Sequence, residues 1–182
     1  MKILFVVYRL DYADQIAIAC LSSIAKQLGH STYFCSVDSE NLTDKVKEIR
    51  PHIVGYSANI LAYKPLVEAN SEAKKSHNYI SIMGGPHPTF SPETFSESGM
   101  DVYCIGEGEL PFRDFLIKIE QGESYDDIAN LITKNKANTV CPLIKNLDEL
   151  PEADRDLVIS NSFLKNTPKK TFYATRGCPF NC

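Results

Sequence analysis

The sequence predicts an α/β protein with a doubly wound, flavodoxin-like sheet of five parallel strands in the order 2-1-3-4-5. Short apolar runs recur along the chain, and most are continuously apolar, as is typical of strands buried on both faces of a parallel sheet. Helical patterns separate these runs, and right-handed crossovers then limit the possible strand orders. Five strands favour the flavodoxin-like order over the six-stranded dinucleotide-binding fold.

The expected strands are, in chain order, residues 2–8, 31–37, 52–57, 79–85 and 101–106. The four helices between and after them are marked by apolar residues at helical spacing: Ala17, Leu21, Ile24 and Leu28; Leu42, Val46 and Ile49; Leu66, Val67, Ala69 and Ala73; and Phe112, Phe115, Leu116 and Ile119. Gly29 and Gly122 supply stops for the first and last helices, and Pro51 ends the second. Pro65 and Pro111 suit the first turns of the third and fourth.

The chain changes character after Gly122. Residues 127–144 are typical of two strands around Asn135–Asn138, which predicts a small β-hairpin appended to the sheet. Residues 145–157 are acidic and contain Pro151, as expected of a linker, and the tail beyond has no core of its own. The predicted division is a sheet domain at 1–122, a hairpin and linker at 123–159, and an irregular tail at 160–182.

Composition narrows the class of protein. The formal charge of −4, with its nineteen Lys and Arg scattered, gives no basic surface for nucleic acid. No apolar run approaches the roughly 20 residues that span a bilayer, and residues 1–10 lack a signal-peptide cleavage site. We therefore expect a cytoplasmic protein. Cys20, Cys35 and Cys104 lie in apolar patterns and are expected in the core, and Cys141 is expected to be inert.

Ligands of open parallel sheets bind beyond the carboxyl ends of the strands. The candidate binding residues in the loops at these ends are Tyr8, Arg9, Leu10, Ser57, Ala58, Asn59, Gly84, Gly85, His87, Pro88, Thr89, Gly106, Glu107, Gly108 and Glu109. Adjacent glycines let a backbone approach a flat or phosphate-bearing cofactor closely. The purely structural alternatives are a tight turn for the glycines, a hydrogen-bonding or surface role for His87, and helix capping for Glu109.

Several common cofactor and catalytic motifs are missing. The sequence holds no G-x-x-x-x-G-K-[ST], no G-x-G-x-x-G after its first strand and no G-x-S-x-G. Residues 8–14 also lack the Ser/Thr-rich phosphate loop expected for flavin mononucleotide. The loops therefore indicate a cofactor outside the commonest classes.

Cys178 and Cys182 form the one cysteine pair with ligand spacing. Zinc sites usually contain C-x-x-C pairs, which this sequence lacks, whereas thiolates hold iron–sulfur clusters. A third ligand at the spacing that leaves one iron open would fall beyond residue 182. We therefore expect the sequence to be truncated inside a cluster motif.

Four motifs in fixed order resemble the N-terminal half of cobalamin-dependent radical S-adenosylmethionine (SAM) enzymes. They are GGPHPTFSPE at 84–93, GEGELPF at 106–112, LDELPEAD at 147–154 and RGCPFNC at 176–182, the last being similar to the opening of C-x-x-x-C-x-x-C. Enzymes of this class include methyltransferases and proteins similar to magnesium-protoporphyrin monomethyl ester cyclases. The resemblance covers the whole chain.

The resemblance implies a cobalamin-binding domain followed by a radical SAM barrel in cis, which acts on a small-molecule substrate. Cobalamin would lie over the carboxyl ends of the strands, with its nucleotide tail in the pocket between the loops. Cys178 and Cys182 match the first two ligands of a 4Fe-4S cluster. The cluster and SAM would belong to the full-length protein only, so the chain by itself is expected to bind cobalamin and catalyse nothing.

One departure from related cobalamin domains concerns cobalt. Methionine-synthase-type domains carry D-x-H-x-x-G after the first strand, and this chain has LDYADQIA at 10–17, without histidine. The resemblance therefore implies cobalamin without a histidine ligand, with Tyr8, Arg9 and Leu10 nearest by position. Two alternatives remain open at this point: a flavodoxin-like flavin-binding electron-transfer or regulatory domain, and a small zinc-binding interaction module.

Overall fold

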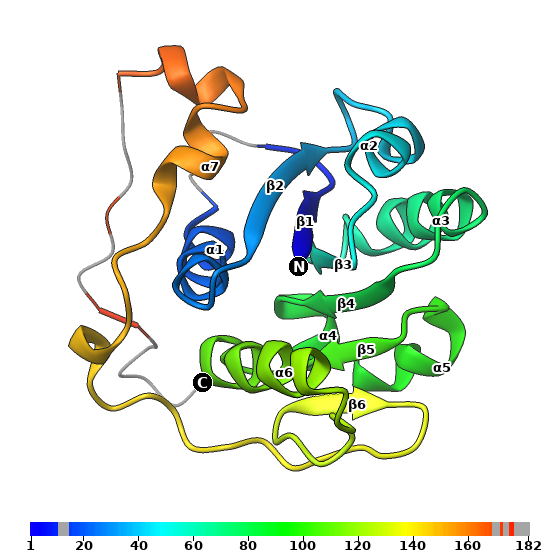
Figure 1. Ribbon diagram of the computed structural model, residues 1–182, viewed down its shortest axis with the longest axis vertical. Helices are drawn as coiled ribbons and strands as arrows, with labels where there is room; N and C mark the ends of the chain where they lie inside the picture. Colours follow the sequence, from blue (N-terminus) through cyan, green and yellow to red (C-terminus); the bar gives the residue numbers. More distant parts are fainter. Residues whose placement is uncertain (11–14, 169–171, 173–174, 177–182) are drawn as a thin grey trace.

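The computed structural model describes residues 1–10, 15–168, 172 and 175–176. The described residues contain a sheet in the order β2-β1-β3-β4-β5-β6 (Figure 1). The strands are β1 (Lys2–Val7), β2 (Ser31–Ser36), β3 (Ile53–Ser57), β4 (Ile80–Gly84), β5 (Val102–Cys104) and β6 (Leu131–Thr133). The first five are parallel, so the predicted flavodoxin-like class and the order 2-1-3-4-5 are confirmed.

Helices cover both faces of the sheet. α1 (Ile16–Gln27) and α6 (Glu109–Gln121) lie on one face, and α2 (Leu42–Ile49), α3 (Tyr63–Lys74) and α5 (Phe95–Ser98) lie on the other (Figure 1). An apolar core lies on each face of the sheet, and β1 contributes to both because side chains alternate along a strand. Ile3, Phe5 and Val7 pack under α1 and α6, while Leu4 and Val6 pack under α2 and α3.

The predicted hairpin after Gly122 adds a sixth strand to the five that were expected. β6 pairs antiparallel with β5, with Leu131 opposite Cys104 and Thr133 opposite Val102. A short return follows, in which Ile132 bridges Ala137. Leu131 is fully buried, and burying it against the core is possible only at the open edge of β5. The residues predicted as an appended hairpin therefore extend the sheet by one strand.

The segment predicted as a linker also contains ordered structure. After the 3₁₀ turn Leu147–Glu149, the chain forms α7 (Arg155–Ile159), and Leu157 and Val158 of this helix are buried in the core on the α1 side. A second 3₁₀ turn, Phe163–Asn166, buries Leu164 in the same core. Leu157, Val158 and Leu164 complete the core of the sheet domain.

The loop after β4, one of those expected to bind a ligand, contains short helical segments. It forms the short helix α4 (Pro86–Phe90), followed by the 3₁₀ turn Pro92–Thr94. Pro86 and Pro88 lie in the first turn of α4, where the missing N–H group costs nothing. No helix among the described residues is long and apolar enough to cross a membrane.

Candidate functional site

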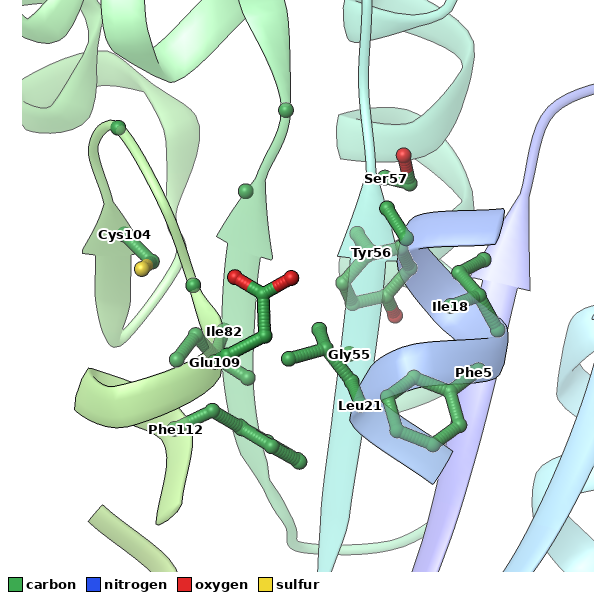
Figure 2. Close-up of a pocket in the computed structure, with 15 residues that line it drawn as sticks. Phe5, Ile18, Leu21, Gly55, Tyr56, Ser57, Ile82, Cys104, Glu109 and Phe112 are labelled. Atoms are coloured by element: carbon green, nitrogen blue, oxygen red, sulfur yellow. The ribbon is translucent and has the colours of Figure 1, made fainter. Parts of the chain in front are cut away.

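A cavity of about 140 Å³ lies between α1 and α6, at the carboxyl ends of the central strands (Figure 2). Its lining is mostly apolar and comes from four strands, two helices and the loops between them. The lining residues are Phe5, Ala17, Ile18, Leu21, Gly55, Tyr56, Ser57, Ile82, Gly84, Gly85, Cys104, Gly106, Gly108, Glu109 and Phe112. Parallel strands bring their carboxyl ends to one edge, which is why residues so far apart in sequence meet here.

Glycines form much of the cavity wall, and the absence of a side chain has a different cause at Gly85 and at Gly108. Gly85 has a φ of 101°, and a Cβ there would meet the carbonyl oxygen of Ala58 at 2.8 Å. Gly108 has an ordinary φ of −96°, and a Cβ there would lie 3.7 Å from Leu21 and 3.8 Å from Cys104. The backbone at Gly108 therefore tolerates a side chain, and its absence leaves space in the cavity.

Glu109 brings the one charged side chain of the lining. It is the first residue of α6, where the helix dipole favours a carboxylate, and its side chain is 8% exposed. Figure 2 shows the carboxylate projecting from the start of α6 among the other lining residues. Oε1 of Glu109 lies 2.6 Å from Nη2 of Arg176, so the charge is paired.

Two thiols near the site are held in their neutral form. Burial raises the pKa of Cys104, which lines the cavity, to about 12, and the charge of Glu109 adds to the effect. Burial also raises the pKa of Cys20 on α1. A neutral thiol behaves as a small apolar group, so Cys104 is an apolar lining residue of the cavity and does not act as a nucleophile. Cys20, Cys35 and Cys104 are buried, as predicted.

The loops predicted to bind a ligand are tied to one another. The hydroxyl of Thr89 donates to the carbonyl of Gly85 at 2.9 Å and accepts from the N–H of Gly106 at 3.0 Å. The N–H of His87 donates to the carbonyl of Ala58 at 2.9 Å. These bonds fix the loops after β3, β4 and β5 in one arrangement.

The structure sorts the fifteen predicted binding residues into two groups. Six of them line the cavity, namely Ser57, Gly84, Gly85, Gly106, Gly108 and Glu109. The others lie outside the lining, namely Tyr8, Arg9, Leu10, Ala58, Asn59, His87, Pro88, Thr89 and Glu107. Ala58 and Thr89 contribute through the loop bonds described above, and Leu10 is buried in the core.

His87 is buried beside the site and does not line the cavity. Its ring stacks on Tyr63 with the centroids 3.9 Å apart, and Nε2 lies 3.1 Å from the hydroxyl of Thr94. Burial lowers the pKa of His87, so the ring is held neutral. Of the alternatives for this residue, the structure supports hydrogen bonding rather than a surface position.

Sequence reasoning missed most of the apolar lining. Phe5, Ile18, Leu21, Ile82 and Phe112 line the cavity but were not among the predicted binding residues, since a cavity wall and a core have the same apolar pattern. Gly55, inside a buried strand, was the available signal, because an isolated strand glycine often marks a close approach.

The predicted cluster ligands Cys178 and Cys182 lie outside the described residues. Within residues 1–10, 15–168, 172 and 175–176, no three His, Cys, Asp or Glu side chains come together as a possible metal site.

A doubly wound sheet with an apolar, glycine-lined cavity at its carboxyl edge defines a cofactor-binding domain. The particular family follows from comparison with known proteins. Residues 1–116 match the family model of the B12 binding domain, and the chain belongs to that family. This assignment supports cobalamin over the flavin alternative.

Curated relatives are methyltransferases by name. The chain is 31% identical over 180 residues to an uncharacterized methyltransferase of Pyrococcus horikoshii, with 92% of this chain and 39% of the relative aligned. It is 24% identical over 169 residues to bacteriochlorophyllide d C-8(2)-methyltransferase of Chlorobaculum tepidum, with 92% of this chain and 34% of the relative aligned. The chain thus spans well under half the length of these relatives.

Solved structures with the same fold include two cobalamin-dependent enzymes. OxsB, a cobalamin-dependent S-adenosylmethionine radical enzyme with aqua-cobalamin and S-adenosylmethionine bound, aligns at a TM-score of 0.70 and 18% identity, over 87% of this chain and 24% of that chain. The radical S-adenosylmethionine methyltransferase TsrM of Kitasatospora setae, with cobalamin and a [4Fe-4S] cluster bound, aligns at 0.67 and 14% identity, over 86% and 32%. The structural alignments with these two enzymes cover more of this chain than the family model does, and they show that the fold is the same.

Proposed function

We propose that the chain is the cobalamin-holding part of a radical SAM methyltransferase, and that the cavity between α1 and α6 receives the nucleotide tail of cobalamin. The corrin ring would then lie over the strand ends, against the loops that contain Ser57, Gly84 to Thr89, and Gly106 to Glu109. Bound cobalamin supplies a transferable methyl group. The protein's own residues bind the tail, exclude water from it and orient the ring.

The observation that carries this proposal is the space left by Gly108. Its φ does not require glycine, and no backbone atom obstructs a Cβ there. The missing side chain therefore serves the cavity rather than the turn. An apolar slot walled by Phe5, Leu21 and Phe112 suits the flat aromatic base at the end of the nucleotide tail.

The lower face of cobalt would have no histidine from the loop after β1, because residues 8–10 are Tyr8, Arg9 and Leu10. Leu10 is buried in the core on the α1 side, whereas Arg9 is exposed. Arg9 and Tyr8 therefore remain the candidates to face the ring. His87 is less suited, since it is stacked on Tyr63 and hydrogen-bonded to Thr94.

The activity of the whole protein is part of the same proposal. The names of the relatives support methyl transfer, and the RGCPFNC motif supports a radical SAM domain that continues in cis with Cys178 and Cys182 as cluster ligands. Substrate contacts would come from that domain. The substrate is therefore proposed only as a small molecule.

The direct test is to fill the cavity with a large side chain. The chain and its Gly108→Phe variant are mixed with hydroxocobalamin, desalted, and compared by visible absorption. We expect the wild type to retain about one cobalamin and the variant to lose at least about tenfold in affinity, because the phenyl ring occupies the slot. Gly99→Asn is the control, since a Cβ at Gly99 has open space and its positive φ suits asparagine.

Retention of cobalamin by Gly108→Phe at wild-type affinity would contradict the assignment of this cavity. Failure of the wild type to retain cobalamin, or retention of a yellow flavin instead, would contradict the function itself. Circular dichroism of each variant establishes that a loss of binding is not a loss of fold.

A further inference from the structure

Arg176, two positions before Cys178, contacts the cavity-lining residue Glu109 although the two are far apart in the sequence. Its Nη2 lies 2.6 Å from Oε1 of Glu109, and its Nη1 lies 3.6 Å from Oε1 of Glu107. The same Nη2 lies 3.9 Å from Sγ of Cys20. Cys20 belongs to α1 and Glu109 to α6, so Arg176 contacts both of the helices that enclose the cavity.

The pairing with Glu109 is the contact with the largest energetic consequence. The side chain of Glu109 is 8% exposed, while that of Arg176 is 33% exposed. A carboxylate that is nearly buried beside apolar walls is costly without a partner, whereas an exposed pair contributes little. Loss of Arg176 would therefore leave a poorly solvated charge in the lining.

We propose that Arg176 is a positioning residue, and that occupancy of the cavity is coupled to the docking of its side chain against α1 and α6. This inference rests on the proposed binding of cobalamin in the cavity. A ligand there removes water from Glu109 and so strengthens the attraction between Glu109 and Arg176. Coupling between two binding events is reciprocal, so a docked Arg176 favours the ligand by the same factor.

This coupling has a consequence for the position of Arg176. Arg176 is held against Glu109 most firmly when the cofactor is bound. Glu109 therefore has a role that helix capping by itself would not require, because it presents the same carboxylate to the cavity and to Arg176.

The first experiment measures the ion pair without cofactor. Unfolding in urea is compared for the wild type, Glu109→Gln, Arg176→Gln and the double variant. We expect the two substitutions to be non-additive by at least about threefold in the unfolding equilibrium constant. Arg113 and Asp114, an exposed pair on the same helix, give the matched control cycle, for which we expect near additivity. Additivity at Glu109 and Arg176 would overturn the proposal.

The second experiment measures the coupling. Trypsin cleaves after Arg176, and release of peptide 177–182 is followed by mass spectrometry with and without saturating hydroxocobalamin. We expect hydroxocobalamin to slow this cleavage about tenfold in the wild type and in Asp114→Asn. In Glu109→Gln we expect faster cleavage that no longer depends on hydroxocobalamin, a result that a purely structural role of Glu109 would not produce.

The outcomes separate the two proposals. If the wild type retains cobalamin and cleavage after Arg176 is unchanged by it, the coupling is overturned and the proposed function stands. If the wild type retains no cobalamin, the proposed function fails and the coupling fails with it, while the cofactor-free cycle still reports whether the ion pair exists.

Discussion

Gly85 has a backbone conformation that residues with a side chain rarely adopt. Its φ is 101° and its ψ is −171°, and this region is essentially restricted to glycine. The adjacent hydrogen bonds explain why the conformation persists. The N–H of His87 donates to the carbonyl of Ala58, and the hydroxyl of Thr89 donates to the carbonyl of Gly85. The loop after β4 is thereby held against the loop after β3.

We expect Gly85→Ala to lower the free energy of unfolding by about 2–4 kcal/mol, because it adds a strained φ to a contact of 2.8 Å with the Ala58 carbonyl. Urea denaturation measures the change. Gly99→Ala is the control, since its φ of 64° is also positive but a Cβ there has open space. We expect it to cost about 1 kcal/mol. Equal losses for the two variants would show that the contact with Ala58 is unimportant.

At the scale of elements, α7 depends on a polar contact with α1. Oδ2 of Asp154, at the start of α7, lies 2.6 Å from Nζ of Lys26 and accepts a hydrogen bond of 2.6 Å from the hydroxyl of Ser22. The N–H of Asp154 donates to the carbonyl of Ala19. Burial by itself raises the pKa of Asp154, but the bonds from Lys26 and Ser22 outweigh it and lower the pKa. The carboxylate is therefore held in its charged form.

We expect Asp154→Ala to lower the free energy of unfolding by about 1–3 kcal/mol, because Ser22 is fully buried and loses a charged acceptor. Asp156→Ala, at an exposed position on the same helix, is expected to stay within about 0.5 kcal/mol of the wild type. Urea denaturation of both variants measures the difference. A wild-type value for Asp154→Ala would mean that the apolar contacts of Leu157 and Val158 suffice to dock α7.

At the scale of the whole molecule, two buried histidines make stability depend on pH. Burial lowers the pKa of His87, and burial together with the charged N-terminus lowers the pKa of His30. In the unfolded chain each titrates near its ordinary value of about 6.5. Below that pH the unfolded state binds more protons than the folded state, so stability is full above about pH 6.5 and falls as the pH drops through it.

We expect wild-type stability to fall between pH 7 and pH 5.5 by up to about 1.4 kcal/mol for each histidine. Urea denaturation across this range measures the slope. His87→Gln should reduce the slope whatever its effect on stability at pH 7, since the substitution removes one titrating group. An unchanged slope would mean that His87 is protonated equally in the folded and unfolded chains.

Local sequence predicted much of the architecture but less of the site. The five parallel strands follow from apolar runs, and the helix ends follow from residues such as Gly29, Pro65 and Gly122. These signals are local, because strand burial and helix termination depend on a few neighbouring residues. Gly84, Gly85, Gly106, Gly108 and Glu109 could be chosen for the same reason, since each lies at the carboxyl end of a strand or in the loop up to the next helix.

The sequence by itself determined the fold class, the strand order and the loops that reach the carboxyl edge. The tertiary structure was needed to show that β6 pairs with the edge strand β5, that α7 completes the core beside α1, and that Arg176 pairs with Glu109. These outcomes depend on pairings between residues far apart in the chain. The free energy of such a pairing depends on which surfaces the rest of the fold leaves uncovered, and no local pattern of residues contains that information.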